Sequence, residues 1–347
     1  MKQIFHTIYI LLGNSCNMNC KYCIQHPLIT NPIPQNINPD IYTFLEKCSR
    51  DSLSIGDKLP LEFYGGEPLL YFDAIKQVFA HTNKFCRFSI ISNGKNITDD
   101  QINTINKYNI SYRMSWDGKN VDFTRGENVV NKESINRLVR IKDFGISAVI
   151  SGMATPFDIL KAFSEQIAKP YFYYNGKFPE LNTDEILNVG NIDPAISSNI
   201  DYDRIRKEVS CIMHQEVKDV PECVYMQWRN NMINIALDTE WSPRQVYAAC
   251  GNGYDTLNLD LAGNLYSCHN LSTPVATINT PYFDYLGRII ETDTTLMFKQ
   301  ECKKCSVFQY CGGGCKFITN SDKRNVYCKL KKAVFEPVIE YINQKIK

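Results

Sequence analysis

A loop of three cysteines follows an apolar run near the start of the chain. The run IYILL leads into GNSCNMNCKYC, so that Cys16, Cys20 and Cys23 have the spacing CxxxCxxC. The apolar run predicts a buried strand. Three thiolates on one loop can hold a 4Fe-4S cluster and leave its fourth iron without a protein ligand. The fold must then provide space for a further ligand where this strand ends, unless the thiols bind structural zinc or are simply buried.

Strand-like and helical runs alternate over roughly residues 4 to 175. This alternation predicts parallel βαβ units and an open α/β barrel. The expected strands are FHTIYILL, LPLEFY, RFSIIS, ISYRMSW, ISAVIS and PYFYY. In such barrels the loops at the carboxyl ends of the strands carry the chemistry. The cysteine loop and the polar motifs after the second, third and fourth strands are therefore expected on one face.

The second expected strand ends in a GGEP motif, formed by Gly65, Gly66, Glu67 and Pro68. Taken alone, the motif is an ordinary helix start, with proline in the first turn and an acidic residue on the helix dipole. Beside a metal cluster it favours ligand contact, because glycines leave room for a ligand to approach the backbone. Glu67 can then add a charge-assisted hydrogen bond.

The cysteine loop and GGEP together resemble the radical S-adenosylmethionine (SAM) superfamily. The resemblance implies a partial (β/α)6 barrel and a catalytic cluster on Cys16, Cys20 and Cys23 that binds the amino and carboxylate groups of SAM. It implies one-electron cleavage of SAM to a 5'-deoxyadenosyl radical, which abstracts hydrogen from a substrate. An electron donor such as flavodoxin or ferredoxin is implied as well. Gly66 and Glu67 are the expected contacts of the SAM ammonium.

Four further residues are candidates for SAM contact under this resemblance. Tyr22 stands just before the last cysteine of the loop. Asn93 and Ser115 end the third and fourth expected strands, where they can meet the ribose or the carboxylate, and Arg125 can pair with the carboxylate. The alternative is that these positions only form turns, since Ser-Asn-Gly and Trp-Asp-Gly are good turn sequences.

The last hundred residues carry seven cysteines, and their spacing resembles the SPASM extension of the same superfamily. The seven are Cys250, Cys268, Cys302, Cys305, Cys311, Cys315 and Cys328. A zinc knuckle is the alternative for the four from Cys302 to Cys315. The resemblance implies two auxiliary 4Fe-4S clusters, and hence three clusters in all.

By the family's interleaved pattern, Cys250, Cys268 and Cys315 hold the first auxiliary cluster, and the other four hold the second. The first cluster then lacks one protein ligand. Some relatives supply it from a cysteine six residues before the Cys250 position, where this chain has Arg244. Either this iron is open to a substrate atom, or Cys211 or Cys223 closes it.

Composition limits the classes of protein to which the chain can belong. Among 347 residues, 44% are apolar and 22% are charged, which is typical of a globular chain. The net charge of +1 gives no general reason to expect nucleic acid, and no apolar run is long enough for a membrane span. Fourteen cysteines without a secretion signal indicate metal ligation in a reducing compartment, the cytoplasm.

The expected domains are a radical SAM partial barrel at 1–180, a helical linker or cover at 181–245, and a SPASM domain with a C-terminal helix at 246–347. The expected function is hydrogen abstraction from a peptide or protein substrate, a ribosomally made precursor peptide, giving a crosslink or an oxidation. The alternatives are a sulfatase-type formylglycine maturase, a small-molecule dehydrogenase and, remotely, a non-catalytic iron-sulfur or zinc protein. In sulfatase-maturing relatives an aspartate follows the second SPASM cysteine, where this chain has His269. The short segment before the first strand leaves no room for a leader-binding domain, so a separate protein or the barrel surface must recognise a leader.

Overall fold

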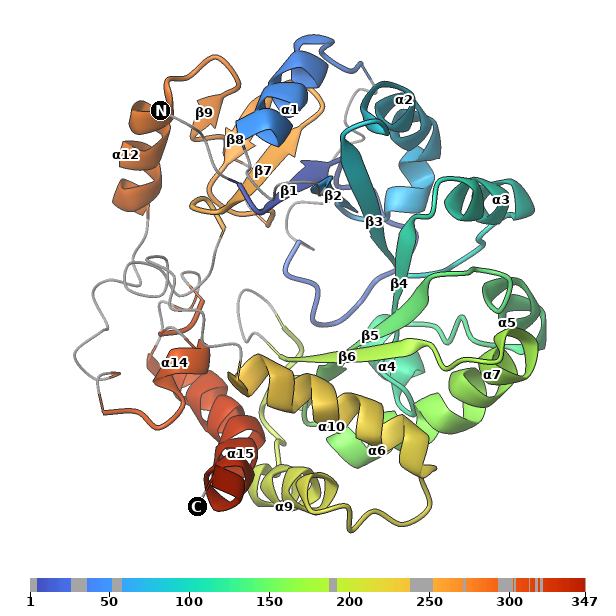
Figure 1. The fold of residues 1–347 in the computed structure, drawn as a ribbon. Coiled ribbons are helices and arrows are strands. Elements are labelled where there is room, and N and C mark those ends of the chain that lie inside the picture. Colours follow the sequence, from blue (N-terminus) through green and yellow to red (C-terminus); the bar gives the residue numbers. More distant parts are fainter. Residues whose placement is uncertain are drawn as a thin grey trace.

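The protein is built around one curved sheet of nine strands (Figure 1). The computed structural model describes residues 5–25, 36–51, 58–186, 192–237, 252–270, 273–292, 302, 304–311, 313–315, 318 and 321–346. The strands are β1 (Thr7–Leu11), β2 (Leu59–Tyr64), β3 (Cys86–Ser92), β4 (Ser111–Ser115), β5 (Phe144–Ile150), β6 (Glu180–Glu185), β7 (Thr256–Asp260), β8 (Asn264–Tyr266) and β9 (Ala276–Thr277). The helices are α1 (Asp40–Asp51), the 3-10 helix η2 (Pro68–Tyr71), α2 (Phe72–Thr82), α3 (Asp99–Lys107), α4 (Val121–Arg125), α5 (Lys132–Leu138), α6 (Pro156–Phe163), the π-helical η3 (Ser164–Ala168), α7 (Lys169–Asn175), α8 (Pro194–Ser197), α9 (Tyr202–Met213), α10 (Glu222–Leu237), α12 (Tyr282–Thr292), α14 (Phe308–Cys311) and α15 (Ser321–Ile346).

The strand order is β6-β5-β4-β3-β2-β1-β7-β8-β9, and the sheet is not closed. The first six strands are parallel, with helices on the outer face, and β7 also pairs with β1 in parallel (Figure 1). The antiparallel strands β8 and β9 then extend the edge beyond β7. The first strand therefore lies inside the sheet, where the C-terminal part of the chain meets the barrel.

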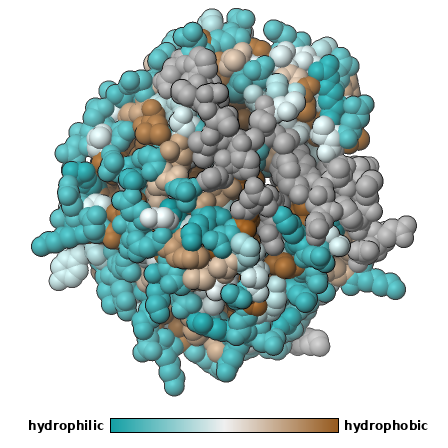
Figure 2. Space-filling view, turned by 180° about the vertical axis from the view of Figure 1, so that it is seen from behind, coloured by the Kyte–Doolittle hydropathy of each residue, from teal (hydrophilic) through white to brown (hydrophobic). Residues whose placement is uncertain are grey.

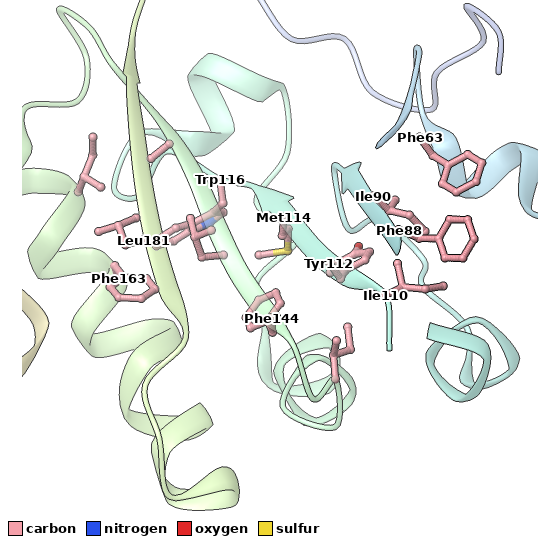
Figure 3. Close-up of a cluster of buried hydrophobic side chains, with 14 of the residues drawn as sticks. Phe63, Phe88, Ile90, Ile110, Tyr112, Met114, Trp116, Phe144, Phe163 and Leu181 are labelled. Carbon is pink, nitrogen blue, oxygen red and sulfur yellow. The ribbon is translucent and has the colours of Figure 1, made fainter. Parts of the chain in front are cut away.

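Apolar residues at alternate strand positions hold the sheet against its helices. Ile8 and Ile10 of β1 are fully buried, as are Leu61 and Phe63 of β2. Figure 3 shows the same layer continuing across Tyr112 and Met114 to the far strands. Because side chains alternate between the two faces of a strand, the intervening positions point into the barrel. Inward strand positions such as Tyr9, Tyr64 and Ser115 line the cavity of the barrel, together with residues of the loops that follow the strands.

The prediction of a sixth strand at PYFYY is wrong, since this segment forms α7. Pro170 lies in the first helical turn, and Gly176 ends the helix in the left-handed conformation. Of the aromatic side chains only Tyr171 is buried, whereas Tyr173 is 95% exposed. A run of aromatic residues favours a strand, but here one face of a helix is enough to bury the side chain that packs.

The actual sixth strand is β6, which has the polar sequence ELNTDE. It pairs with β5 along its whole length, from Gly145 opposite Glu180 to Ile150 opposite Glu185. Its outer side is covered by α10, whose Trp228 donates from Nε1 to Thr183 Oγ1 at 2.9 Å. The barrel sheet therefore extends to residue 185, into the segment expected to be only linker and cover.

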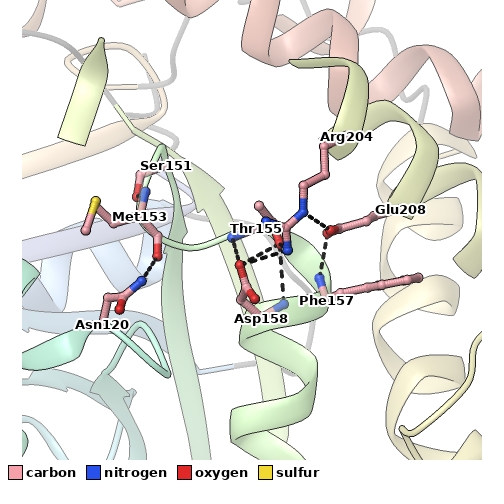
Figure 4. Close-up of polar contacts among 8 residues, drawn as sticks. All are labelled: Asn120, Ser151, Met153, Thr155, Phe157, Asp158, Arg204 and Glu208. Atoms are coloured by element: carbon pink, nitrogen blue, oxygen red, sulfur yellow. Dashed lines mark hydrogen bonds and ion pairs between the residues drawn. The ribbon is translucent and has the colours of Figure 1, made fainter. Parts of the chain in front are cut away.

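The helices after β6 cover the open side of the sheet. Figure 4 shows how α9 is attached to the start of α6: the guanidinium of Arg204 binds Asp158 and Glu208, and Glu208 accepts from the backbone N–H of Phe157 at 2.9 Å. The long α15 packs along α9 and carries Glu336, which pairs with Arg206. The face seen in Figure 2 is mostly hydrophilic, with small separate apolar areas. None of the helices in the described part of the chain is long and apolar enough to cross a membrane.

Candidate functional site

A cavity of about 500 Å³ lies at the carboxyl ends of the barrel strands. The sequence-predicted residues that line it are Cys16, Cys20, Tyr22, Cys23, Gly65, Gly66, Asn93, Ser115 and Arg125. They come from the loops after four different strands. The fold thus brings together nearly all of the residues expected to serve one site.

The two glycines of GGEP are required because the loops after β1 and β2 touch. A Cβ on Gly65, where φ is +152°, would lie 2.3 Å from the carbonyl oxygen of Gly13. A Cβ on Gly66 would lie 2.3 Å from the carbonyl oxygen of Ser15. The backbone N–H groups of Gly66 and Glu67 donate to those same two oxygens, at 2.8 and 2.9 Å. The glycines therefore fix the cysteine loop, in addition to lining the cavity.

The carboxylate of Glu67 binds protein groups and does not line the cavity. Its Oε1 accepts from the backbone N–H of Leu69 at 2.9 Å and from Ser92 Oγ at 2.8 Å. Its Oε2 accepts from the backbone N–H of Asn93 at 2.7 Å. The side chain is 1% exposed, and burial raises its pKa against the effect of these three donors. Glu67 joins the loop after β2 to the loop after β3, and Pro68 starts η2 behind it.

Asn93 connects this network to the first cysteine. Its Nδ2 donates to Asn17 Oδ1 at 2.7 Å and lies 3.8 Å from the sulfur of Cys16. The sequence indicated Asn93 as a ligand contact or a turn residue. The geometry adds a third role. The backbone of Asn93 is held by Glu67, and its side chain in turn binds Asn17 of the cysteine loop.

Tyr22 and Arg125 meet at Asp117, the aspartate of the Trp-Asp-Gly turn sequence. The guanidinium donates from Nε to Asp117 Oδ2 at 3.1 Å and from Nη2 to Oδ1 at 3.2 Å. The Tyr22 hydroxyl donates to the same carboxylate at 2.6 Å, and the Tyr22 ring lies 5.3 Å from the guanidinium carbon. This pairing uses Nε and Nη2 of the guanidinium, and contact of Arg125 with a ligand carboxylate stays a prediction. The Asp-Gly sequence indicated only a turn, whereas Asp117 also forms a buried ion pair with Arg125.

The three loop cysteines fit a cluster with an adjoining ligand. All three line the cavity, and their charges act on one another. Burial raises the pKa of Cys20 to about 11, while the nearby Arg125 guanidinium acts in the opposite direction. Cysteines that hold a cubic cluster bind separate irons, and the cavity leaves space for a further ligand beside them.

Four of the C-terminal cysteines lie close together around the start of α15. The charges of Cys302 and Cys305 raise the pKa of Cys328, and those of Cys328 and Cys302 raise the pKa of Cys311, in each case after burial as the main cause. Arg324 of α15 donates to the sulfur of Cys302 at 3.4 Å. These are the four cysteines expected for the second auxiliary cluster.

Two of the remaining auxiliary cysteines lie within the described residues. Cys315, like Cys311, packs against Ile318 and Tyr327, and so does Ile24, which directly follows the first cysteine loop. Cys268 is buried beside the end of β8, close to Tyr64. Cys250 lies outside the described residues, so the membership of the first auxiliary cluster stays a prediction.

Cys211 and Cys223 are not placed to complete that cluster. Cys211 lies on α9, beyond Arg206, which pairs with Glu336 in the second half of α15. Glu336 is eight residues past the last cluster cysteine, or about 12 Å along the helix. Cys223 begins α10 and is exposed. Both helices lie on the opposite side of the molecule from β8, the strand that Cys268 follows (Figure 1). Arg244 lies outside the described residues.

An open α/β sheet with three cluster-type cysteines at its carboxyl edge is the arrangement of radical SAM enzymes, and comparison with known proteins confirms that resemblance. No protein-family model matches the chain. The radical SAM cyclopropyl synthase TigE of Paramaledivibacter caminithermalis is 23% identical over 381 aligned positions, which cover 96% of this chain and 74% of TigE.

Solved structures show the same fold. The structure of anSMEcpe with bound AdoMet and the Cp18Cys peptide superposes with a TM-score of 0.66 and 18% identity, covering 99% of this chain and 100% of that one. Streptococcus suis SuiB bound to the precursor peptide SuiA gives a TM-score of 0.58 and 17% identity, covering 90% of this chain and 72% of SuiB.

Proposed function

We propose that this chain is a radical SAM enzyme that acts on a peptide or protein, and that its substrate is a ribosomally made precursor peptide. The observation that carries the proposal is the cavity, where the cysteine loop, the glycine pair and Arg125 meet with space left for a second molecule. Three similar proteins support the proposal. TigE is a radical SAM cyclopropyl synthase, anSMEcpe has a structure with bound AdoMet and a peptide, and SuiB has a structure with its precursor peptide.

Each group at the site has a proposed role. Cys16, Cys20 and Cys23 hold the cluster, and Asn93 keeps the loop in place. Ser115 and Arg125 line the space where the polar groups of SAM would lie. With cluster and SAM bound, one-electron cleavage of SAM supplies the radical that takes hydrogen from the substrate.

We assign the seven C-terminal cysteines to two auxiliary 4Fe-4S clusters, which makes three clusters in all. The grouping of Cys302, Cys305, Cys311 and Cys328 supports the second of them. If these auxiliary clusters accept the electron that the substrate radical loses, the favoured product is an oxidation or a crosslink. Flavodoxin or ferredoxin as the electron donor, a separate leader-binding protein and a cytoplasmic location belong to the same proposal.

The experiment is anaerobic reconstitution followed by iron, sulfide and SAM-cleavage assays. Three cubic clusters require about twelve irons and twelve sulfides. Replacing Cys16, Cys20 and Cys23 together by alanine should remove about four irons and abolish formation of 5'-deoxyadenosine. The matched control is Cys48→Ala, which changes a buried cysteine of α1 away from the cavity. Zinc without iron in anaerobically purified protein would refute the proposal.

The substrate is tested by co-expression with short open reading frames next to the gene. Mass spectrometry of each peptide should reveal loss of two hydrogens in one of them, and tandem spectra should place the change. A neighbouring sulfatase gene whose product gains formylglycine would instead support the formylglycine maturase. Unmodified peptides together with oxidation of a small molecule would support the dehydrogenase.

A further inference from the structure

The cavity also contains groups that the proposed roles do not use. Asp184 and Glu185 come from the end of β6, and Lys331 comes from α15. Tyr9 and Tyr64 come from β1 and β2, on the other side of the barrel interior. The sequence did not predict a function for any of these residues.

Lys331 is fully engaged by its neighbours. Its ammonium lies 2.5 Å from Glu185 Oε2, and the two side chains are 15% and 5% exposed. The ammonium also lies 5.0 Å from the centre of the Phe335 ring and 5.7 Å from that of Tyr327. This pair docks α15 onto β6, and the Lys331 charge also acts on the neighbouring Asp184.

Asp184 has no such partner. Within the described part of the chain its carboxylate makes no hydrogen bond and no ion pair, and the side chain is accessible from the cavity. Besides Lys331, the permanent cation that lines the cavity is Arg125, and it is bound to Asp117. Burial and the adjacent Glu185 raise the pKa of Asp184, while the Lys331 ammonium acts in the opposite direction. Two carboxylates therefore share one ammonium, so that Asp184, Glu185 and Lys331 together carry a net charge of −1 when both acids are ionised.

Aromatic rings line the same cavity as this carboxylate. Tyr9 and Tyr64 meet edge to face with ring centres 5.7 Å apart, and His269 packs on both, at 4.7 and 4.5 Å. Burial is the main cause that raises the pKa of both tyrosines, and the charge of Asp184 adds to it, after that of Glu62 for Tyr9 and after those of Cys23, Cys268 and Glu62 for Tyr64. A carboxylate and aromatic rings that line one cavity suit a cationic group, through a charge-assisted hydrogen bond and cation–π attraction.

We propose that Asp184, Tyr9, Tyr64 and His269 form a subsite for a lysine or arginine side chain of the peptide substrate. The inference rests on the proposed function, because the ligand is that peptide. Asp184 is exposed to the cavity. A substrate cation would balance the net negative charge of Asp184, Glu185 and Lys331, whereas an apolar side chain would cover the Asp184 carboxylate and leave this charge unbalanced.

The test measures binding to the reconstituted, SAM-loaded enzyme by equilibrium dialysis. The probes are N-acetyl-Gly-Xaa-Gly-amide peptides in which Xaa is lysine, arginine, norleucine or citrulline. The lysine and arginine peptides should bind about ten- to a hundredfold more tightly than their neutral counterparts. Asp184→Asn should remove this preference, and Asp184→Glu should retain part of it. The matched control is Glu180→Gln, at the other end of β6, which should keep the preference.

Three results would overturn the subsite. They are equal binding of charged and neutral peptides, binding of none of them, and a charge preference that persists in Asp184→Asn. A large fall in SAM affinity in Asp184→Asn would assign this carboxylate to SAM instead. Failure of the proposed function is recognised separately, because wild-type enzyme that does not cleave SAM can still be tested for peptide binding.

Discussion

Replacing Glu67 by glutamine tests whether this residue organises the site or contacts SAM. The carboxylate accepts from Leu69 N–H, Ser92 Oγ and Asn93 N–H. Glutamine has nearly the same shape but only one oxygen. If that oxygen keeps Leu69 and Ser92, the amide NH2 group faces the N–H of Asn93, so that two donors oppose each other.

The magnitude follows from these three bonds. A buried N–H without an acceptor costs about 1–3 kcal/mol, and two bonds that lose their charge assistance weaken by about 1 kcal/mol each. Removing a buried charge returns part of this, since burial raises the pKa of Glu67. The net loss of unfolding free energy should be about 2–3 kcal/mol, or a fall of roughly 3–4 °C in melting temperature for a chain of 347 residues.

The assay combines anaerobic melting, iron analysis, SAM binding and hydrogen exchange. Exchange should accelerate in Glu67→Gln most at the amide of Asn93, which loses its acceptor, and less at the amide of Leu69, whose acceptor loses its charge. The control is Glu127→Gln, which breaks a half-exposed pair with Lys95 and should cost less than about 1 kcal/mol. A tenfold loss of SAM affinity with unchanged melting and exchange would refute this reasoning and return Glu67 to direct contact with the ligand.

Three further perturbations follow from the same structure. Gly66→Ala should lower both iron content and melting temperature, because its Cβ would lie 2.3 Å from the Ser15 carbonyl oxygen. The control is Gly287→Ala on α12, which should lower neither, because a Cβ there meets nothing within 4 Å. Equal behaviour of the two variants would contradict the argument. Cys311→Ala, in protein shown by circular dichroism to be folded, should still form 5'-deoxyadenosine but fail to give oxidised peptide; full product would make that cluster structural only. For Asp184, whose folded-state pKa is raised, stability falls as pH rises from the unfolded value through the folded one, so Asp184→Asn should melt higher than wild type at pH 7, and the difference should shrink toward pH 4. A variant that melts no higher at pH 7 would show that Asp184 already has a compensating partner.

The cysteine loop shows how far local sequence reaches. Three thiols within eight residues must lie near one another whatever the rest of the chain does, so their spacing predicts the kind of metal group directly. Five of the six barrel strands were also predictable, because their apolar residues pack under a layer of helices. The parallel order then places the ends of these strands, and their loops, at one edge.

The sixth strand marks the limit of that reasoning. The inner face of β6 borders a polar cavity and its outer face receives Trp228, so its sequence lacks the apolar run of a buried strand. The aromatic run at 170–174 predicted a strand more strongly than the sequence of β6 did. Of its aromatic side chains, however, only that of Tyr171 is buried.

The sequence by itself determined which residues can hold a cluster and that they stand at the ends of barrel strands. Only the tertiary structure decided what the polar residues between them do. Glu67 binds the next loop, Arg125 is held by Asp117, and Asp184 is left without a partner while Glu185 takes Lys331 from a helix nearly 150 residues away. The physical reason is that such pairings depend on which charges meet in a buried space, and contacts between distant segments leave no periodic trace in the chain.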